Sequence, residues 1–379
     1  SPNLTYMAES KHESSDAGVG RTQAADSVKL LRSAPLRFGL CCQFIEQPIK
    51  FRTTTATSLL RMEPEARREK LSQLCLHNAA ALAAAITYCT ENEIGCFRIN
   101  SAILPVKTHP EAGYATQDLP HAGAIVERFQ TAGRLAVERG VRLVFHPDQF
   151  IVLNSPREEV VQRSIADLEY QAEVAAWVKA DVINIHAGGA YGDKPAALDR
   201  LARNLDRLSA AARARITVEN DDKIFTPRDL AAWCRHNGVP LVYDVHHHRC
   251  ASDGWTVSQA TREALSTWDR EPVFHISSPL LGWQGPRPER HHDFVDVHDF
   301  PSEWLSLAVT VEVEAKAKEL AVRRLREALR AGPRPADGTP AAAAEKPVER
   351  PIEKSAAASD ELDWMWPAGG KVMTPYSEG

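Results

Sequence analysis

The feature that most constrains the fold is an eightfold alternation of short apolar runs with longer segments of helical period. The apolar runs are rich in β-branched residues and cover Arg37–Gln43, Cys96–Ser101, Val141–His146, Val182–His186, Ile216–Asn220, Leu241–Asp244, Val273–Ser277 and Val309–Glu314. The segments of helical period cover 64–92, 121–139, 157–179, 195–212, 226–237, 257–266 and 315–330. Strands that alternate with helices pair in parallel, and eight such units can close into a ring. The sequence therefore predicts the α/β class and a (β/α)8 TIM barrel.

Composition divides the chain into a body and two tails. Residues 1–34 are polar, lack periodicity and are predicted to be disordered. Residues 35–330 form the predicted barrel domain. Residues 331–379 comprise a Pro/Ala-rich linker and a Trp-containing segment, which we expect either to pack on the body or to dock a partner.

Charge, cysteine content and hydropathy indicate the compartment of the protein and the kinds of partner it can bind. The net charge of −5 argues against a broad basic face, although bound divalent cations would make one site locally positive. Seven cysteines without a CxxC pair indicate a reducing compartment rather than a disulfide framework. No run approaches the roughly 20 apolar residues of a membrane span, and the N-terminus lacks the apolar core of a signal peptide. We therefore expect a cytoplasmic protein that does not contact a membrane, and separately we expect a monomer.

Imidazoles and carboxylates stand at the ends of six consecutive predicted strands, the third to the eighth. In a barrel of this kind these ends share one rim, where catalytic residues gather. The strand-end residues are His146, His186, Glu219, Asp244, His275 and Glu314. His247 follows Asp244 by three residues, and the long link after the seventh strand adds Arg290 and His291. Single residues of these types are usually structural, so the weight of the observation lies in the consecutive run.

Such a set predicts a cluster of divalent metal ions. Many unpaired carboxylates in one cavity would be costly, and bound cations remove that cost. Imidazole and carboxylate ligands suit zinc, manganese or iron, and Glu219 could bridge two ions. Multi-metal sites stabilise the attacking and leaving oxygens of a phosphoryl displacement. His246 and His248, beside His247, are expected to have supporting or structural roles.

The motifs around these residues resemble the UV damage endonuclease family, within the endonuclease IV and xylose isomerase-like barrels. The resemblance spans Leu36 to Leu329 and is carried by FRINSAILP, FHPDQFIVLNSP, NIHAGG, TVEND, YDVHHH, FHISSP, RHHDF and EAKAKE. It implies a metal-dependent DNA repair endonuclease that nicks the phosphodiester backbone 5′ to damaged bases and leaves a 3′ hydroxyl. It also implies that damaged double-stranded DNA is the partner.

The resemblance further implies three metal ions, usually manganese, with zinc, iron or magnesium as other candidates. The ligands implied for the first ion are His146, His186 and Glu219. Those implied for the second ion are Glu219, Asp244, His275 and Glu314. The third ion would be held by His247 and His291, helped by Asp244 or a neighbour. The residues expected to be catalytic are Glu219, His186 and Glu314.

The resemblance also implies residues that contact DNA. Gln149 and Phe150 match a Gln and an aromatic residue that the family inserts into the duplex. An amide and a ring can fill the stack when damaged bases leave it. Arg290 and Trp283, in the link after the seventh strand, are expected to contact phosphate and base.

Three departures from the family keep other functions open. Leu40 and Phe44 stand where members carry Tyr and Asn, and Val273 stands where they carry Lys. The same metals could therefore serve another substrate, as in a sugar isomerase or epimerase. A second alternative is an iron enzyme that acts on a small molecule, a peptide or a partner's cysteine, with the C-terminal Trp-rich segment as a handle. A non-catalytic interaction protein is disfavoured because the candidate ligands are all retained. Because the ligand set exceeds the needs of an isomerase, we prefer the endonuclease.

Overall fold

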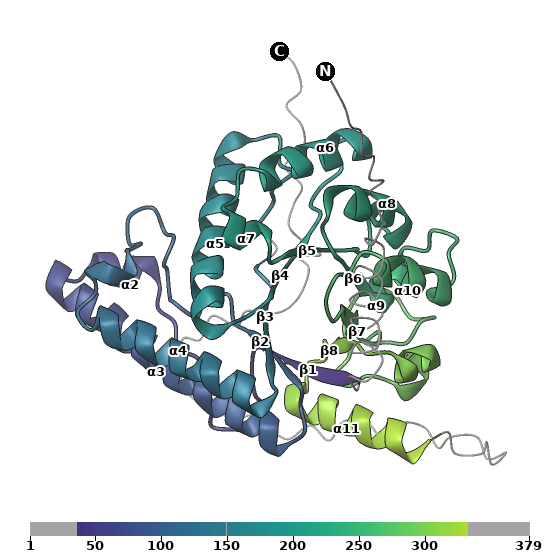
Figure 1. Ribbon diagram of the computed structural model, residues 1–379, viewed down its shortest axis with the longest axis horizontal. Coiled ribbons are helices and arrows are strands. Elements are labelled where there is room, and N and C mark those ends of the chain that lie inside the picture. Colours follow the sequence, from purple (N-terminus) through teal and green to yellow (C-terminus); the bar gives the residue numbers. More distant parts are fainter. Residues whose placement is uncertain (1–35, 149, 333–379) are drawn as a thin grey trace, which may run out of the picture. The chain divides into compact units, whose positions relative to one another are not determined.

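Eight parallel strands form the frame of the molecule. The computed structural model describes residues 36–148 and 150–332. Each strand pairs with its sequence neighbours, and β1 pairs with β8, so that the sheet closes (Figure 1). The strands are β1 (Arg37–Cys41), β2 (Cys96–Ile99), β3 (Arg142–Phe145), β4 (Val182–His186), β5 (Ile216–Glu219), β6 (Leu241–Asp244), β7 (Val273–Ile276) and β8 (Thr310–Val313). The predicted (β/α)8 barrel is confirmed, and every predicted run contains its observed strand. The predicted tails fall almost entirely outside the described residues.

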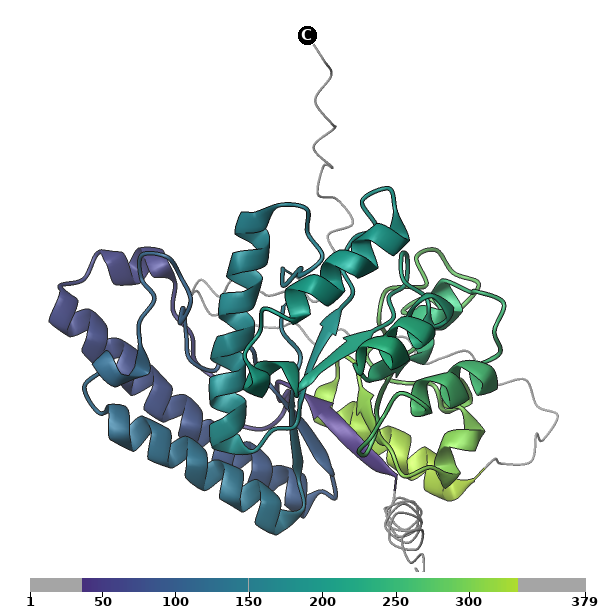
Figure 2. The ribbon, with the colours of Figure 1, turned by 45° about the horizontal axis from the view of Figure 1, so that its top comes forward.

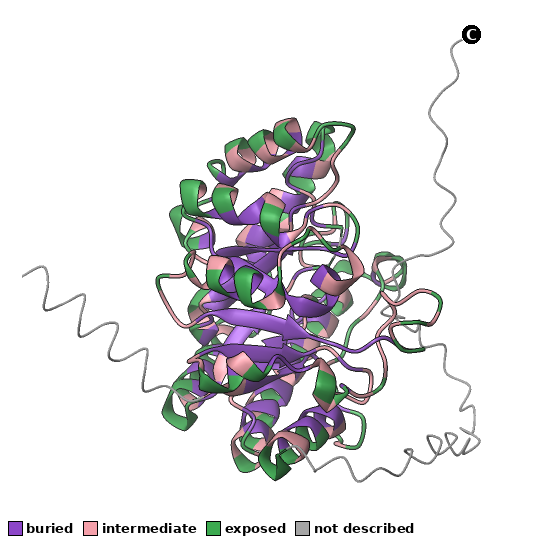
Figure 3. Ribbon diagram, turned by 90° about the vertical axis from the view of Figure 1, so that its right-hand side faces the viewer, coloured by how far each residue is buried: buried purple, intermediate pink, exposed green. Residues whose placement is uncertain are grey.

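Helices cover the outer side of the barrel. Helices α3 to α6, α8 and α10 lie outside the ring of strands (Figures 1 and 2). The helices are α2 (Ala56–Leu60), α3 (Pro64–Glu91), α4 (Ala122–Arg139), α5 (Glu158–Val178), α6 (Lys194–Leu205), α7 (Ala210–Arg213), α8 (Pro227–Asn237), α9 (Val245–Cys250), α10 (Val257–Leu265) and α11 (Lys318–Ala331). Short 3-10 turns are η1 (Thr116–Asp118), η2 (Val297–Asp299) and η3 (Ser302–Ser306). The strands are buried and many helix surfaces are exposed (Figure 3). Within the described ranges, no helix combines the length and the apolar character that crossing a membrane would require.

Local sequence explains where the helices begin and why one prediction is wrong. Pro64, Pro195 and Pro227 all stand in a first helical turn, where a missing N–H is tolerated. The single helix predicted for 195–212 is instead two helices, α6 and α7. The Ser209 hydroxyl accepts a hydrogen bond from the backbone N–H three residues on, at 3.2 Å. This cap begins a new helix, because it satisfies a donor that has no partner within the helix.

The barrel interior contains two layers of opposite character. The lower layer is a buried apolar cluster of Cys96, Val144, Val182, Val242 and Val273. Two residues further along the chain, in each case, stand the residues of the upper layer: Arg98, His146, Asn184, Asp244 and His275. Side chains two apart on a strand share a face, so the upper layer also faces inward, nearer the carboxyl ends of the strands. An apolar plug therefore lies directly beneath a polar layer.

A buried tryptophan anchors the long link between β7 and β8. Trp304, in η3, is fully buried, and its indole N–H donates to the Thr261 hydroxyl at 2.9 Å. Its ring lies 5.0 Å from that of Phe274, measured between centroids. Earlier in the link, an isolated antiparallel bridge joins Pro279 to His291. The link is thus packed structure that holds His291 near the barrel mouth.

Candidate metal centre at the barrel mouth

The register of the strands brings the predicted ligands to one rim. His186 lies opposite Glu219 across β4 and β5, and Asp244 lies opposite His275 across β6 and β7. The remaining two strand-end residues, which directly follow β3 and β8, are His146 and Glu314. Because all the strands are parallel, these ends point to the same side of the barrel.

Glu219 lies at the centre of the cluster. Its Oε2 atom is 3.0 Å from Nε2 of His146, and its Oε1 atom is 3.3 Å from Nδ1 of His247. The same Oε1 atom is 3.2 Å from Nδ1 of His275. The carboxylate is fully buried, so its charge is surrounded by imidazoles rather than by water. One carboxylate that faces several imidazoles through both oxygens can be shared by more than one cation.

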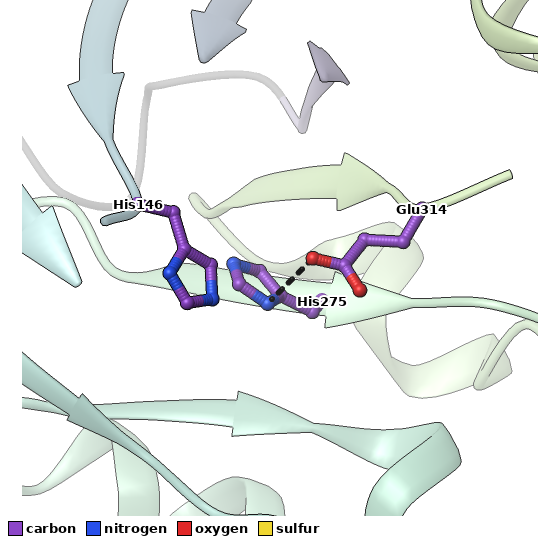
Figure 4. A group of neighbouring side chains, drawn as sticks. All are labelled: His146, His275 and Glu314. Carbon is purple, nitrogen blue, oxygen red and sulfur yellow. Dashed lines mark ion pairs between the residues drawn. The ribbon is translucent and has the colours of Figure 1, made fainter. Parts of the chain in front are cut away.

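Three groups of side chains have ligand atoms close enough to share a cation. In each group, these atoms all lie within 4.8 Å of one another. The groups are His146, His186 and Glu219; Glu219, Asp244 and His247; and His146, His275 and Glu314. Figure 4 shows the last group, in which Nδ1 of His275 lies 3.3 Å from Oε1 of Glu314. The first group is the set expected for the first ion, and the other two combine the expected ligands differently.

Unpartnered polar atoms inside the cluster fit bound cations. Among the described residues, five candidate ligand atoms are buried without a hydrogen-bond partner: His146 Nδ1, His186 Nδ1, Glu219 Oε1, Asp244 Oδ2 and His275 Nδ1. Such atoms are uncommon in folded proteins, because each loses its hydration without compensation. Imidazole nitrogens and carboxylate oxygens bind zinc, manganese and iron. The donor set therefore fits divalent metal ions.

The side chains of the cluster shift one another's pKa values. Burial acts to raise the pKa of Glu219, but His275, His186 and neighbouring imidazoles hold it well below its usual value. Burial acts to lower the pKa of His275, but the carboxylates of Glu219 and Glu314 raise it to about 10. Burial raises the pKa of Asp244 to about 6 despite the nearby imidazole of His247. Without metal, the cluster therefore retains protons that a bound cation would displace.

The short helix α9 turns His247 into the cluster. Asp244 caps this helix by accepting a hydrogen bond from the backbone N–H of His247 at 2.7 Å. His248 points elsewhere, and its ring nitrogens lie 2.8 Å from the Tyr243 hydroxyl and 3.0 Å from Asp253. Those contacts agree with the structural role expected for His248, whereas His247 lies beside the candidate metal ligands Glu219 and Asp244.

The link after β7 places His291 at the edge of the cluster. Nδ1 of His291 lies 4.0 Å from Oε2 of Glu314, and the residue stands outside the three groups. Its ring packs 5.2 Å from that of His246. Trp283 is half-buried, and its indole N–H donates to Asp299 at 2.7 Å. Arg290, also half-buried, precedes His291 in this link. The assignments of His291 to a metal and of Trp283 and Arg290 to DNA stay predictions.

The residues expected to probe a lesion belong to the loop after β3. Gln149 lies outside the described residues. Phe150 is 76% exposed, so its ring is not part of the core. It borders a groove with a volume of about 660 Å³, whose lining includes Arg157, Arg163 and Tyr191. An exposed ring beside basic and aromatic side chains suits contact with nucleic acid.

At the positions that depart from the family, apolar residues pack into the core. Leu40 is fully buried, and Val273 belongs to the lower layer. The ring of Phe44 stacks on Phe97 at a centroid distance of 5.8 Å and meets Tyr88 edge-on. These three residues therefore offer no ligand to the cluster.

Sequence reasoning missed three polar residues beneath the predicted ligands. The side-chain N–H of Asn184 donates to Oε2 of Glu219 at 2.6 Å. Arg98 and Glu312 form a buried ion pair that also touches His275. A detectable pattern was present, since each of these residues stands two positions before or after an inward-facing residue of its strand.

Comparison with known proteins agrees with this geometry. The family model described as UV-endonuclease UvdE matches residues 36–333. A UV DNA damage endonuclease of Bacillus cereus (strain Q1) is 30% identical over 283 residues, which cover 72% of this chain and 86% of that protein. The UV DNA damage endonuclease of Bacillus cereus (strain G9842) is 29% identical over 296 residues, covering 74% of this chain and 89% of that protein.

Two solved structures are also similar to this chain. The crystal structure of SacUVDE superposes with a TM-score of 0.70 at 26% identity, covering 78% of this chain and 98% of that chain. Endonuclease IV from Thermus thermophilus shares the fold, with a TM-score of 0.51 at 17% identity, and covers 78% of this chain and 99% of that chain. The family model spans the whole barrel, including the strand ends that carry the candidate metal ligands. The chain therefore belongs to the UV-endonuclease UvdE family.

Proposed function

We propose that this protein is a metal-dependent endonuclease that nicks damaged double-stranded DNA on the 5′ side of the lesion and leaves a 3′ hydroxyl. The observation that carries the proposal is the convergence of imidazoles and carboxylates from six strands, with buried donor atoms that lack partners. In a member of the UvdE family, such a cluster supports phosphodiester hydrolysis. The family match lends no support to the sugar isomerase and iron-enzyme alternatives.

The proposed cofactor is a set of three divalent ions, with manganese the first choice and zinc, iron or magnesium as alternatives. The three overlapping ligand groups, which share His146 and Glu219, support more than one bound ion, and the number three follows the family resemblance. When bound, the ions would polarise the phosphate and supply hydroxide at neutral pH. Glu219 would hold two ions together, because it belongs to two groups. His186 and Glu314 would complete the sets on either side of it.

The chain itself would orient the DNA around this centre. Phe150, exposed beside the groove, would fill the stack where damaged bases are displaced, with Gln149 as its partner. Arg157 at the groove and Arg290 on the link after β7 would contact phosphates. Trp283 would stack on a base. The positive charge of the bound ions would offset the net charge of −5, which otherwise disfavours DNA. We further propose that the protein acts as a monomer in the cytoplasm; the Trp-rich segment proposed for docking lies outside the described residues.

A plasmid nicking assay tests the proposal. The metal-free full chain, supplied with Mn²⁺, is incubated with supercoiled plasmid that has been UV-irradiated or left intact. We expect conversion to the open circle only with irradiated DNA, and mapped ends that begin 5′ to the lesion with a 3′ hydroxyl. The His186→Ala variant should lose bound metal and nicking together. Absence of nicking on both plasmids by a metal-loaded chain would refute the proposal.

A further inference from the structure

A fully buried ion pair lies beneath the metal centre, between strands that supply few predicted ligands. Arg98 is on β2 and Glu312 is on β8, and their side chains are only 2% and 1% exposed. Neither residue belongs to the three groups of candidate ligands. Buried ion pairs are costly to form, because both charges lose their hydration. A pair placed so deep therefore calls for an explanation beyond stability.

The two side chains make contacts that reach directly to candidate ligands. Nε and Nη2 of Arg98 donate to the two carboxylate oxygens of Glu312 at 3.0 and 2.8 Å. Nη2 of Arg98 also lies 2.7 Å from Oε1 of Glu314. On the other side, Oε2 of Glu312 lies 2.8 Å from Nε2 of His275. The pair thus touches two members of one ligand group.

A glycine makes this arrangement possible. Strand β1 lies between β2 and β8, and Gly39 pairs with Glu312 on one side and with Cys96 on the other. A Cβ atom at position 39 would come within 3.1 Å of Cγ of Glu312. Because glycine leaves that space open, the Glu312 side chain can meet Arg98 across the intervening strand.

The contacts determine which nitrogen of His275 faces the cations. Nδ1 of His275 is the buried atom without a hydrogen-bond partner, and it lies between the carboxylates of Glu219 and Glu314. A nitrogen that binds metal carries no proton, so the proton resides on Nε2 and is donated to Glu312. Arg98 donates to the same Glu312 oxygen, which explains why its Nη2 atom stands only 3.0 Å from Nε2 of His275.

We propose that Arg98 and Glu312 are positioning residues for the metal centre. Glu312 holds the His275 ring with Nδ1 toward the cations, while Arg98 neutralises Glu312 and holds one oxygen of Glu314. This inference rests on the proposed metal-dependent function and names the residues that orient its ligands. Carboxylate partners of metal-binding histidines fix the ring and increase its basicity, and their loss lowers metal affinity about 10- to 100-fold.

The test measures Mn²⁺ binding to the metal-free full chain by calorimetric titration. The main variant is the double substitution Arg98→Met with Glu312→Met, because apolar replacement of a whole buried ion pair usually preserves the fold. We expect thermal unfolding of its metal-free form close to that of the wild type, with affinity at one or more Mn²⁺ sites lowered about 10- to 100-fold. The single variant Glu312→Gln, which keeps a hydrogen-bond acceptor for His275, should lose less affinity than the double variant.

A second arginine, half-buried on the neighbouring strand β3, provides the control. Arg142, at the amino end of β3, pairs with Asp181 at 2.7 Å, and within the described part of the chain its hydrogen bonds and ion pairs involve no candidate metal ligand. The Arg142→Met variant should keep wild-type Mn²⁺ affinity even if it unfolds more easily. Wild-type affinity in the double variant, or an equal loss in Arg142→Met, would overturn the positioning role. A wild-type chain that binds no Mn²⁺ would instead refute the metal-dependent function itself, so the two failures are distinguishable.

Discussion

The lower and upper layers of the barrel interior differ by two residues along the same strands, yet their physical characters are opposite. The side chains of the lower layer are apolar and pack against one another, so they need no hydrogen-bond partner. In the upper layer and the rim above it, several buried imidazole nitrogens and carboxylate oxygens have no hydrogen-bond partner. The difference indicates a division of labour, since apolar packing stabilises the fold whereas unsatisfied polar atoms are retained for a ligand.

The largest expected effect lies in the upper region. Glu219→Gln keeps the size of the side chain but removes the charge shared by two ligand groups. We expect the rate of nicking of UV-irradiated plasmid to fall by at least about 100-fold, because losing a ligand should exceed the loss of a supporting residue. Mn²⁺ content, measured on the same preparation, should fall with it. Full activity in this variant would contradict the assignment of metal binding to the upper region.

A change in the lower layer should have the opposite outcome. Val242→Ala removes apolar volume from a fully buried position. Urea unfolding of the metal-free protein should show a loss of about 2 kcal/mol, from lost burial and the cavity left behind. Mn²⁺ affinity should remain within about twofold of the wild type. A large loss of affinity would show that the plug also orients the ligands.

The pH dependence should separate the layers further. The pKa of His275 is raised from 6.5 to about 10, so its contribution to stability in the metal-free protein is full below pH 6.5 and is lost as the pH rises toward 10. Metal binding follows the opposite trend, because a cation must displace this proton. Mn²⁺ affinity should increase about tenfold per pH unit for each proton displaced.

Calorimetric titrations at about pH 6.5 and 7.5, in two buffers of different ionisation enthalpy, would measure this proton release. The Val242→Ala variant should show the same slope, since no lower-layer group titrates in this range. A wild-type affinity that does not change with pH would contradict the assignment of His275 as a ligand.

The smallest effect is expected outside both layers. Phe150→Ala removes an exposed ring that touches neither interior layer. Loss of one stacking contact, worth about 1 kcal/mol, should slow nicking of damaged plasmid about fivefold. Mn²⁺ affinity and unfolding should not change. An unaltered nicking rate would exclude the ring from lesion recognition.

Much of the fold could be predicted, because strand and helix periods are local properties of the sequence. All eight strands were found, and the predicted rim residues converge because parallel strands end on one side. The break at Ser209 was missed, since a hydroxyl inside an apolar pattern does not reveal that it caps a helix. The grouping of ligands depends on distances between strands, which no local pattern contains.

Arg98 and Glu312 show most clearly what sequence could not supply. Each stands in a strand of ordinary appearance, and a charged residue there is usually directed to solvent. Their spacing of two residues from Cys96 and Glu314 suggests an inward direction, but only the closed register shows that the two side chains meet across β1. The family resemblance drew attention to the candidate metal ligands, and it did not extend to the two residues that contact them from beneath.

The missing side chain at Gly39 has a consequence for how the barrel closes. Main-chain hydrogen bonds join β1 to each of its neighbours. In addition, the ion pair of Arg98 and Glu312 joins β2 to β8 on the inner side of β1, in the space that Gly39 leaves open. The first strand of the fold is thereby enclosed between two partners that attract each other. Detachment of β1 would expose the buried charges of Arg98 and Glu312 to water, directly beside the candidate ligands His275 and Glu314.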